Sequence, residues 1–454
     1  MHKQHYSIDM IHGPLAGKIL LFALPLMASS LLQRLFNTAD TIVMGRFAGS
    51  DALAAVGSCN YLVDLFVSFF VGFSMGTDVT ISRAFGANDM TRVIKGVHTT
   101  VSFSLLCGIL LGLMGFFFAP HMLRITSVPE EILDLAVLYV RIYFLGAPAS
   151  MVYNFGAALL RTQGDTKRPL YYLTAAGVVN VLLNLVFVIV FHLSTDGVAL
   201  ATIISQYFSA VLVIRCLMRE KGPLHLDLHQ LTLDKGIIGS IIRLGLPSGL
   251  ESSLYSISNV TIQSAINSFG STVIAGSSAA SSINALANVP YASINQAVLT
   301  FSSQNRGAEQ YHRVDRVILL GVLYGAGISL LLGNLCVIFG RPLLSIYVGG
   351  EEEVIREGLI RMQMMCPYTF TASIMGTMGA ALRALGYSVI PMVVAILGTC
   401  GLRLLWVALV LPFFGTPSSL YVVWPISWSV TALTLTVIFF LVRKKVYSKT
   451  ALQH

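Results

Sequence analysis

Residues 158–164 read Ala-Leu-Leu-Arg-Thr-Gln-Gly, and residues 380–386, which lie 222 positions further along, read Ala-Ala-Leu-Arg-Ala-Leu-Gly. A spacing close to 222 also joins other matching pieces of sequence: Leu24-Pro25 with Leu246-Pro247, Gly86-Ala87 with Gly307-Ala308, Arg92-Val93 with Arg313-Val314, and Pro169 with Pro391. Matches that recur in one order at one offset indicate an internal duplication. The sequence therefore predicts two copies of one structural unit.

The composition of the chain is that of a protein immersed in lipid. Hydrophobic residues make up 55% of the 454 residues and charged residues 11%, whereas charged residues make up about 25% of soluble domains. A chain with so little charge cannot stay dispersed in water, but it can lie in a bilayer, which then takes the place of the solvent. We therefore expect an integral membrane protein.

Twelve apolar segments approach the ~20 residues that a helix needs to cross a bilayer. The first segment follows a polar stretch, residues 1–14, and contains Pro25, so we interpret it as a membrane helix and not as a cleavable signal. The predicted spans are 19–45, 53–80, 96–119, 133–159, 170–191, 197–217, 237–266, 272–300, 316–339, 354–381, 388–411 and 419–442.

These spans predict an all-α membrane protein with twelve transmembrane helices in two pseudo-symmetric six-helix lobes. Residues 1–217 form the predicted N-terminal lobe, residues 218–236 the cytoplasmic linker and residues 237–454 the C-terminal lobe. Because each lobe has an even number of spans, both insert in the same orientation and are related by an axis along the membrane normal. Two such bundles that face each other enclose a cleft, as alternating access requires.

Lysine and arginine are distributed unequally between the two sides of this arrangement. Of the 29 Lys and Arg residues, 21 fall in segments, from Lys3 to Lys449, that are cytoplasmic when both termini are cytoplasmic, and 4 fall in the opposite loops. Positive residues accumulate in cytoplasmic loops. We therefore predict a multi-pass protein of the cell membrane with both termini in the cytoplasm. The net charge of +8 is a topology signal and gives no evidence for nucleic acid binding.

Several motifs of enzymes and ATP-driven pumps are missing from the sequence. The run from Gly13 to Lys18 lacks the spacing and residue types of a phosphate-binding loop. The six cysteines are scattered singly, without the spacing of a zinc or redox site. No segment is a soluble domain large enough to bind a nucleotide. We therefore expect no enzyme activity, no cofactor and no ATP-driven pumping.

Asp40 is the most unusual residue in the predicted spans, because an ionisable group at membrane depth costs at least about 2.5 kcal/mol. Gln33, Asn37 and Asp40 follow the i, i+4, i+7 spacing and so share one face of the first helix. Two further spans carry polar pairs at the i, i+4 spacing: Asn180 with Asn184, and Thr202 with Gln206.

Three polar stripes at comparable depth predict a cation site around Asp40. A carboxylate ringed by amide and hydroxyl oxygens suits Na⁺, whose hydration shell these oxygens replace; alternatively, the carboxyl group itself takes up and releases a proton. The plainer alternative is that Asp40 only hydrogen-bonds helices together. Pro25 lies below the stripe and removes a backbone hydrogen bond, so we hypothesise that a bend there responds to the charge on Asp40.

Other ionisable side chains inside the spans have plainer interpretations. No role is assigned to Asp64 or Glu251, and in the second half Glu251 and Asn259 form no cluster like the one around Asp40. Three arginines lie inside spans, and we expect them to pair with a carboxylate or with helix carbonyls: Arg34, Arg141 and Arg403.

The residues around Asp40 belong to a longer pattern of short motifs. The pattern consists of Leu35-Phe36-Asn37-Thr38-Ala39-Asp40, Gly45, Ala52-Leu53-Ala54-Ala55-Val56-Gly57, Gly86-Ala87-Asn88-Asp89 and Leu160-Arg161-Thr162-Gln163-Gly164-Asp165. In this order and spacing the chain resembles the multidrug and toxic compound extrusion (MATE) family over essentially its whole length, most closely the DinF-like branch. The resemblance implies a V-shaped pair of six-helix lobes that exports amphipathic, often cationic, drugs in exchange for H⁺ or Na⁺.

The resemblance also implies where the coupling ion binds. Some members have an acid at the place of Asn184, so Asp40 is the sole acid of the site here. Tyr255 and Thr371 stand near places where some branches have acids, which argues against an ion site of that kind in the second lobe. We favour H⁺, because the DinF-like resemblance supports it and a lone Asp completes a neutralising cycle by itself; Na⁺ at the same site is the alternative. The implied cation site consists of Asp40, Asn180, Asn184 and Thr202.

The expected partners are small amphipathic or cationic drugs and the lipid bilayer, and the expected state is a monomer. Two other functions stay open. A flippase for a lipid-linked precursor requires a cationic cavity for phosphate, for which Arg34 and Arg141 are the candidates, and a channel is disfavoured by the duplicated lobes. We assign six residues to the substrate site: Gln33, Asn37, Asp40, Met151, Asn154 and Gln206.

Overall fold

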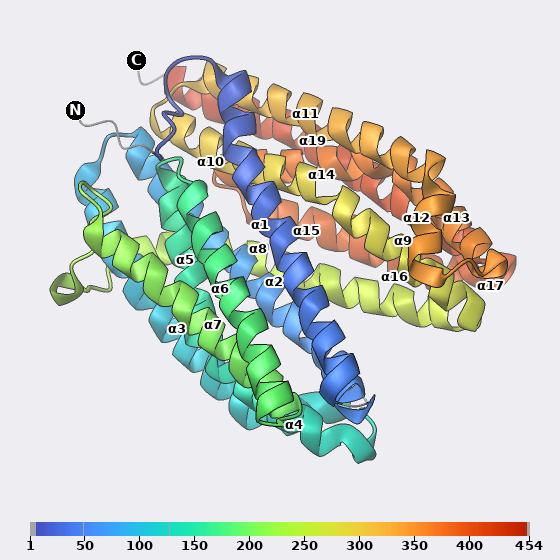
Figure 1. The fold of residues 1–454 in the computed structure, drawn as a ribbon. Helices are drawn as coiled ribbons and strands as arrows, with labels where there is room; N and C mark the ends of the chain where they lie inside the picture. Colours follow the sequence, from blue (N-terminus) through green and yellow to red (C-terminus); the bar gives the residue numbers. More distant parts are fainter. Residues whose placement is uncertain (1–5, 49, 127, 452–454) are drawn as a thin grey trace. The chain divides into compact units, whose positions relative to one another are not determined.

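The computed structural model describes residues 6–48, 50–126 and 128–451, and within these ranges the regular structure is entirely helical. The chain separates into two compact units (Figure 1). Unit 1 consists of Ala28–Gly249 with the segment up to Asp9, and unit 2 consists of Met10–Met27 with the chain from Leu250 onward. The chain passes from one unit to the other at Met10, at Ala28 and at Leu250, and the offset of the sequence repeat separates the last two positions.

The described helices of the first half of the chain begin with one that contains Pro25 and end with one that contains Pro247. Their bounds are α1 (Leu15–Val43), η1 (Met44–Ala48), α2 (Ser50–Gly86), α3 (Met90–Ile125), α4 (Glu130–Leu145), α5 (Ala147–Thr162), α6 (Lys167–Leu185), η2 (Val186–Val190), α7 (Thr195–Arg219), η3 (Leu228–Gln230) and α8 (Lys235–Asn267). Here η1 and η2 are π-helical turns and η3 is a 3₁₀ turn.

The second half contains more breaks than the first (Figure 1). Its π-helical turns are η5 and η6, and η4 is a 3₁₀ turn. The bounds are α9 (Ser271–Ala287), α10 (Val289–Gly307), α11 (Tyr311–Ile338), α12 (Gly340–Val348), α13 (Glu352–Met365), η4 (Cys366–Tyr368), α14 (Thr369–Ala384), α15 (Val389–Ala395), η5 (Ile396–Gly401), α16 (Leu402–Leu405), η6 (Trp406–Val410), α17 (Leu411–Phe414), α18 (Pro417–Tyr421) and α19 (Val423–Ala451).

Eight helices of the described chain are long and apolar enough to cross a membrane, and a bent pair raises the number to nine. The three other predicted spans, 237–266, 272–300 and 354–381, are helical as well, but their helices are shorter or richer in Ser and Asn. The predicted lobe boundaries and the cytoplasmic position of both termini stay predictions. Lys3 and the side chain of Lys449, counted among the inside charges, lie outside the described residues.

The predicted single helix over 133–159 is wrong in detail, because the chain bends there by 44° between α4 and α5. Pro148 follows the break and has no N–H to donate to the preceding turn. Gly146 forms the break, and a Cβ placed on it would lie 2.2 Å from Oε1 of Gln206. The bend therefore depends on a proline that ends the hydrogen-bond ladder and on a glycine that leaves room for α7.

The interior of unit 1 is packed with aromatic rings and close helix contacts. Phe73 on α2 lies edge-to-face with Phe103 on α3 and Phe155 on α5, with ring centroids 5.8 and 5.6 Å apart. A Cβ on Gly76 would lie 2.3 Å from the carbonyl oxygen of Ile241, so α2 and the first turns of α8 touch backbone to backbone. This packing holds α2, α3, α5 and the first turns of α8 together.

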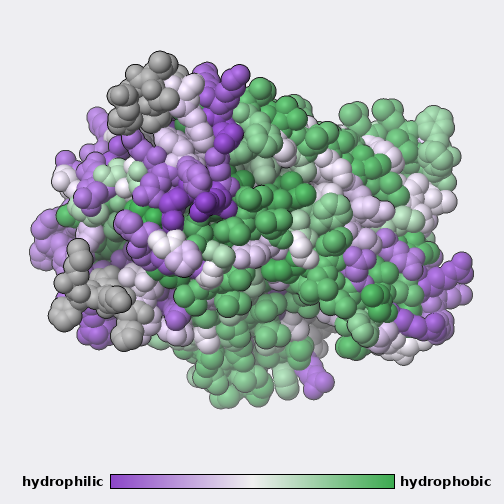
Figure 2. Space-filling view, turned by 90° about the horizontal axis from the view of Figure 1, so that it is seen from above, coloured by the Kyte–Doolittle hydropathy of each residue, from purple (hydrophilic) through white to green (hydrophobic). Residues whose placement is uncertain are grey.

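Large apolar side chains cover much of the molecular surface (Figure 2). Phe117 on α3 and Leu433 on α19 are each 67% exposed, and they are two of many such residues. Soluble monomers rarely expose continuous apolar areas beyond a few hundred Å². A surface of this kind fits contact with lipid tails, in agreement with the apolar length of the helices.

The two arginines of the repeated Ala-x-Leu-Arg motif each pair with an acid. Nε of Arg161 lies 3.2 Å from Oδ2 of the fully buried Asp78 on α2, and Nη2 of Arg383 lies 2.5 Å from Oε2 of Glu251 on α8. The acids come from different places in the two halves. The duplication therefore preserves the arginine and has changed its partner.

Replacing Asp78 by Ala should lower stability strongly, because Arg161 is then left as a mostly buried charge without this partner. Breaking a buried pair in this way costs about 3–5 kcal/mol. The measurement is the thermal midpoint of the purified protein in detergent. Glu352→Ala is the control, since the Glu352–Arg341 pair is largely exposed and is worth at most about 1 kcal/mol. Equal midpoints for the two variants would contradict the prediction.

Candidate cation site

Asp40 lies in the last turn of α1, where the helix passes close to α6. A Cβ on Gly177 of α6 would lie 2.0 Å from the ring of Phe36, which is one turn before Asp40. The missing side chain at Gly177 therefore allows α1 to approach α6 closely enough for their polar residues to meet. Asp40 is half-buried, whereas Asn184 has no exposed surface.

Two amides of α6 surround the carboxyl group of Asp40. Nδ2 of Asn184 donates to Oδ1 of Asp40 at 2.5 Å. One terminal atom of the Asn180 amide lies 2.8 Å from Oδ1 and 3.0 Å from Oδ2 of Asp40; with the nitrogen in this position, Asn180 donates to both oxygens. The i, i+4 pair on α6 thus faces the carboxyl group of α1 as the sequence predicts.

Thr202 of α7 completes the cluster. Its hydroxyl donates to the carbonyl of Val198 at 2.9 Å and lies 3.5 Å from the Asn180 amide. The structure therefore brings together all four residues assigned to the cation site, from three helices of one unit. We refer to Asp40, Asn180, Asn184 and Thr202 as the Asp40 cluster. That this cluster binds a cation stays a prediction.

The cluster lies where two helices lose their regular hydrogen bonding. The π-helical turn η2 begins two residues after Asn184, the turn η1 follows α1 four residues after Asp40, and the two turns contact each other. π-helical turns occur frequently at functional sites.

Comparison with known proteins then decides the family: the MatE family model matches residues 25–186 and 247–409.

The chain belongs to the MatE family. The two matched blocks begin at positions 25 and 247, which are separated by the offset of the sequence repeat, so they coincide with the two copies found in the sequence. The resemblance to the MATE family drawn from the motifs around Asp40 is thereby confirmed.

Individual MatE proteins resemble the chain over most of its length. It is 29% identical to the "Probable multidrug resistance protein YoeA" of Bacillus subtilis over 390 residues, which is 84% of each chain. It is 26% identical to YpnP of the same organism, which also carries the name "Probable multidrug resistance protein", over 77% of this chain and 78% of that one.

A MATE crystal structure in the bent conformation superposes with a TM-score of 0.90 at 20% sequence identity, over 97% of this chain and 98% of the other. This likeness confirms the predicted all-α, twelve-helix fold of a multi-pass membrane protein.

The residues predicted to bind substrate do not join the Asp40 cluster, apart from Asp40 itself. Gln33 and Asn37 are exposed on α1. Met151 is fully buried against the aromatic interior of unit 1. Asn154 donates to the carbonyl of Ser150 at 2.8 Å. Gln206 lies beside Gly146 at the α4–α5 bend. Their assignment to the substrate stays a prediction.

The arginines within the spans have different partners. Arg141 donates to the carbonyl of Phe116 at 3.3 Å and lies over its ring, which confirms the expected pairing with a helix carbonyl. Arg34 is exposed and attracts Asp64 of α2. For Arg403 the expected carboxylate or carbonyl is wrong: it donates to amide and hydroxyl oxygens and lies over aromatic rings.

Arg361 is a buried cation that the sequence reasoning missed. It lies within the predicted span 354–381, donates to the carbonyl of Ser277 at 3.1 Å, and stacks over Trp424. The position of this Arg in the middle of an apolar segment is the feature of the sequence from which it could have been identified. No cavity for phosphate is shown at Arg361 in the described part of the chain, so Arg34 and Arg141 as the cationic candidates of a flippase stay a prediction.

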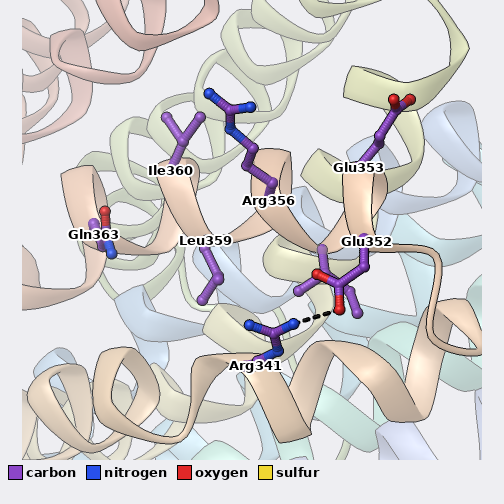
Figure 3. Close-up of a pocket in the computed structure, with 8 residues that line it drawn as sticks. Arg341, Glu352, Glu353, Arg356, Leu359, Ile360 and Gln363 are labelled. Carbon is purple, nitrogen blue, oxygen red and sulfur yellow. Dashed lines mark hydrogen bonds and ion pairs between the residues drawn. The ribbon is translucent and has the colours of Figure 1, made fainter.

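A surface hollow of about 470 Å³ lies far along the sequence from the Asp40 cluster, on α12 and α13 (Figure 3). Its polar lining includes the exposed Arg341–Glu352 ion pair, and Arg356 and Gln363 also border it. No residue of the cation or substrate predictions lines this hollow, so it gives no support to either.

Proposed function

We propose that this MatE protein is a secondary active multidrug transporter of the cell membrane, with both termini cytoplasmic. It exports amphipathic or cationic compounds in exchange for protons that bind Asp40, and it acts as a monomer. Family membership and the multidrug resistance names of the relatives YoeA and YpnP support transport of small molecules. The geometry of the Asp40 cluster supports the proton as the coupling ion.

The observation that carries the proposal is the position of the Asn180 amide, which can present either its nitrogen or its oxygen to Asp40. Turned with its nitrogen inward, it donates to an ionised carboxylate, at 2.8 and 3.0 Å. Turned with its oxygen inward, it accepts the single proton of a neutral carboxyl group from Oδ2, at 3.0 Å. Asn184 donates to Oδ1 in either state. The amides of the cluster can therefore hydrogen-bond Asp40 in both its ionised and its protonated form, with no ion other than H⁺.

Protonation changes what holds α1 against α6. An ionised Asp40 accepts from both amides, and hydrogen bonds to a charged group are about twice as strong as neutral ones. A protonated Asp40 loses that charge-assisted attraction, so α1 is freer to move or bend. Pro25 removes one backbone hydrogen bond lower in the same helix, which provides a place for such a bend. Proton binding is in this way linked to helix geometry, as antiport requires.

Na⁺ is the second candidate, because one oxygen of the cluster is unused. Oδ1 of Asn184 is buried and has no hydrogen-bond partner among the described residues. Together with the carboxylate of Asp40 and the hydroxyl of Thr202, it gives the oxygen ligands that a hard cation prefers. The bond from Nδ2 of Asn184 to Asp40 counts against this arrangement, because the same amide has to turn over before it can face a shared ion.

Proton flux in proteoliposomes separates the two candidates. With the protein reconstituted at fixed pH, addition of an amphipathic cationic drug should drive a proton flux that is the same with and without Na⁺. A pH indicator inside the vesicles and a fluorescent substrate measure the two fluxes together. Transport that requires Na⁺ and moves no protons would contradict proton coupling and support the alternative.

A further inference from the structure

Arg403 on α16 is fully buried in unit 2, with all its donor nitrogens engaged. Nη1 donates to Oδ1 of Asn259 at 3.1 Å, Nη2 to the hydroxyl of Tyr255 at 3.3 Å, and Nε to the hydroxyl of Ser427 at 3.3 Å. The guanidinium carbon lies 5.0 Å from the ring centroid of Tyr255 and 5.4 Å from that of Trp424. These contacts come from α8 and α19.

The guanidinium has no ion-pair partner in the part of the chain that the structure describes. The nearby Glu251 of α8 instead pairs with Arg383 at 2.5 Å. A second buried cation, Arg361, lies 5.3 Å from the Trp424 ring centroid, so Trp424 contacts two guanidinium groups. A buried charge without a counter-ion is costly, and ring faces and neutral oxygens offset only part of the cost. Such a group needs a functional reason.

The position of Arg403 in the sequence repeat indicates such a functional reason. Asn180 follows Pro169 by eleven residues, and Arg403 follows the matching Pro391 by twelve. Between Pro391 and Arg403 lies the π-helical turn η5, and a π-bulge adds one residue to a helix. Arg403 therefore occupies the place in the second copy that Asn180 occupies in the first.

The two partners of Arg403 on α8 correspond to residues on the Asp40 face of α1 that lie outside the Asp40 cluster. At the offset of the sequence repeat, Asn259 is the counterpart of Asn37, and Tyr255 is the counterpart of Gln33. Asp40 corresponds to Ile262, which is buried and apolar. The second copy therefore has an apolar residue at the place of the acid and a buried cation beside the corresponding helix.

We propose that Arg403 is a fixed cation that permanently occupies the second-half counterpart of the Asp40 cluster, and so confines cation exchange to the first half. This rests on the proposed antiport function. An arginine side chain does not lose its proton in proteins, and it cannot leave the chain. Helices α8, α16 and α19 are thereby held in a cation-bound arrangement throughout the cycle, and one coupling site operates instead of two. Arg403 is a positioning residue in this scheme.

Chemical rescue tests whether transport requires the positive charge of Arg403. Arg403→Ala removes the guanidinium and leaves a space of its shape lined by Asn259, Tyr255 and Ser427. Transport should fall by about tenfold or more, because the variant leaves a cavity and removes the donor from the oxygens of Asn259, Tyr255 and Ser427. Millimolar guanidinium chloride should restore the thermal midpoint and the transport rate with saturation, because the ion refills the space. Urea, which has a similar shape and no charge, should restore neither. Arg341→Ala, at an exposed arginine, is the matched control and should respond to neither compound.

Arg403→Lys and Arg403→Met keep the test informative if the Ala variant does not fold. Lys retains a positive charge but lacks the planar fork of donors, so it should keep part of the native transport rate, whereas Met has similar bulk without charge and should lose about tenfold or more. Protons moved per substrate should be the same in the Lys variant and the native protein. Native transport by Arg403→Met, or equal rescue by urea and guanidinium, would overturn the proposal. The thermal midpoint alone measures whether guanidinium binds to Arg403→Ala, without any transport assay. This result therefore stays valid even if Asp40 proves dispensable and the proposed function fails.

Discussion

Asp40→Asn should reduce drug export in proteoliposomes to the level of empty vesicles and abolish the coupled proton flux. Asn has the shape of Asp and can still hydrogen-bond Asn184 and Asn180, so the packing of α1 against α6 is preserved. It cannot alternate between a neutral and a charged form, and without that change the cluster has one state. The measurement is drug uptake against an imposed pH gradient, with the thermal midpoint as the test of folding.

Asp64→Asn is the matched control for this variant, because Asp64 is another acid inside a span of the same half but is exposed and outside the cluster. It should retain most of the native rate. Full transport by Asp40→Asn, at a normal thermal midpoint, would remove Asp40 from the mechanism. Equal loss in both variants would show that charge anywhere in these spans is required, and not the cluster.

Gly177→Ala should impair coupling although every polar residue is intact. The new methyl group would lie 2.0 Å from the Phe36 ring, so the ring has to shift, and we expect α1 to move with it away from α6 and to lengthen the 2.5 Å bond between Asn184 and Asp40. Overpacking of this kind costs about 1–3 kcal/mol, which corresponds to roughly a fivefold to 150-fold loss of the coupled state. Drug-driven proton flux and the thermal midpoint measure the effect.

Two further variants make the Gly177 result specific. Gly57→Ala on α2 is the control, since a Cβ there meets nothing within 4 Å and a helical Gly to Ala change is favourable by about 0.5–1 kcal/mol. Gly177→Ala combined with Phe36→Ala restores the space and should recover part of the flux. Native activity of Gly177→Ala alone, or no recovery in the double variant, would contradict the role of this close approach.

The parts of the molecule that local sequence patterns determine were predictable. The length of the apolar segments predicts the helices, because it depends on residues near one another in the chain. The repeat offset close to 222 predicts the two copies, because it depends on direct repetition of sequence. The i, i+4 spacing of Asn180 and Asn184 places both amides on one face of α6, and Asp40 meets them because Gly177 leaves α1 room. The sequence pattern alone does not predict this contact, because the two helices are far apart in the chain. It follows only from the family resemblance or from the structure.

The parts that depend on irregular backbone were not predictable. The α4–α5 bend was not predicted, because hydropathy averaged over a window stays high across Gly146 and Pro148 and so indicates one continuous span. The partners of Arg403 were missed because the π-helical turn η5 shifts it by one residue, and a plain comparison at the repeat offset pairs it with Val181 instead of Asn180. Substrate residues such as Met151 were chosen by residue type, and the structure packs this one inside unit 1.

The duplicated halves therefore differ in charge at their corresponding polar clusters. The first half has one acid between two amides, and the second half has a buried guanidinium between neutral oxygens and aromatic rings. An acid can exchange its cation with the solvent, whereas a guanidinium cannot. The asymmetry is what a transporter with a single coupling site requires.

Infrared difference spectroscopy of the carboxyl groups tests most directly whether Asp40 carries the coupling proton. Adding a transported drug to the reconstituted native protein should remove the band of one protonated carboxyl group and produce the matching carboxylate band. The Asp40→Asn protein, which still has Asp64 and every other acid, should show neither change. The same pair of bands in Asp40→Asn, or their absence from the native protein during active transport, would contradict the account.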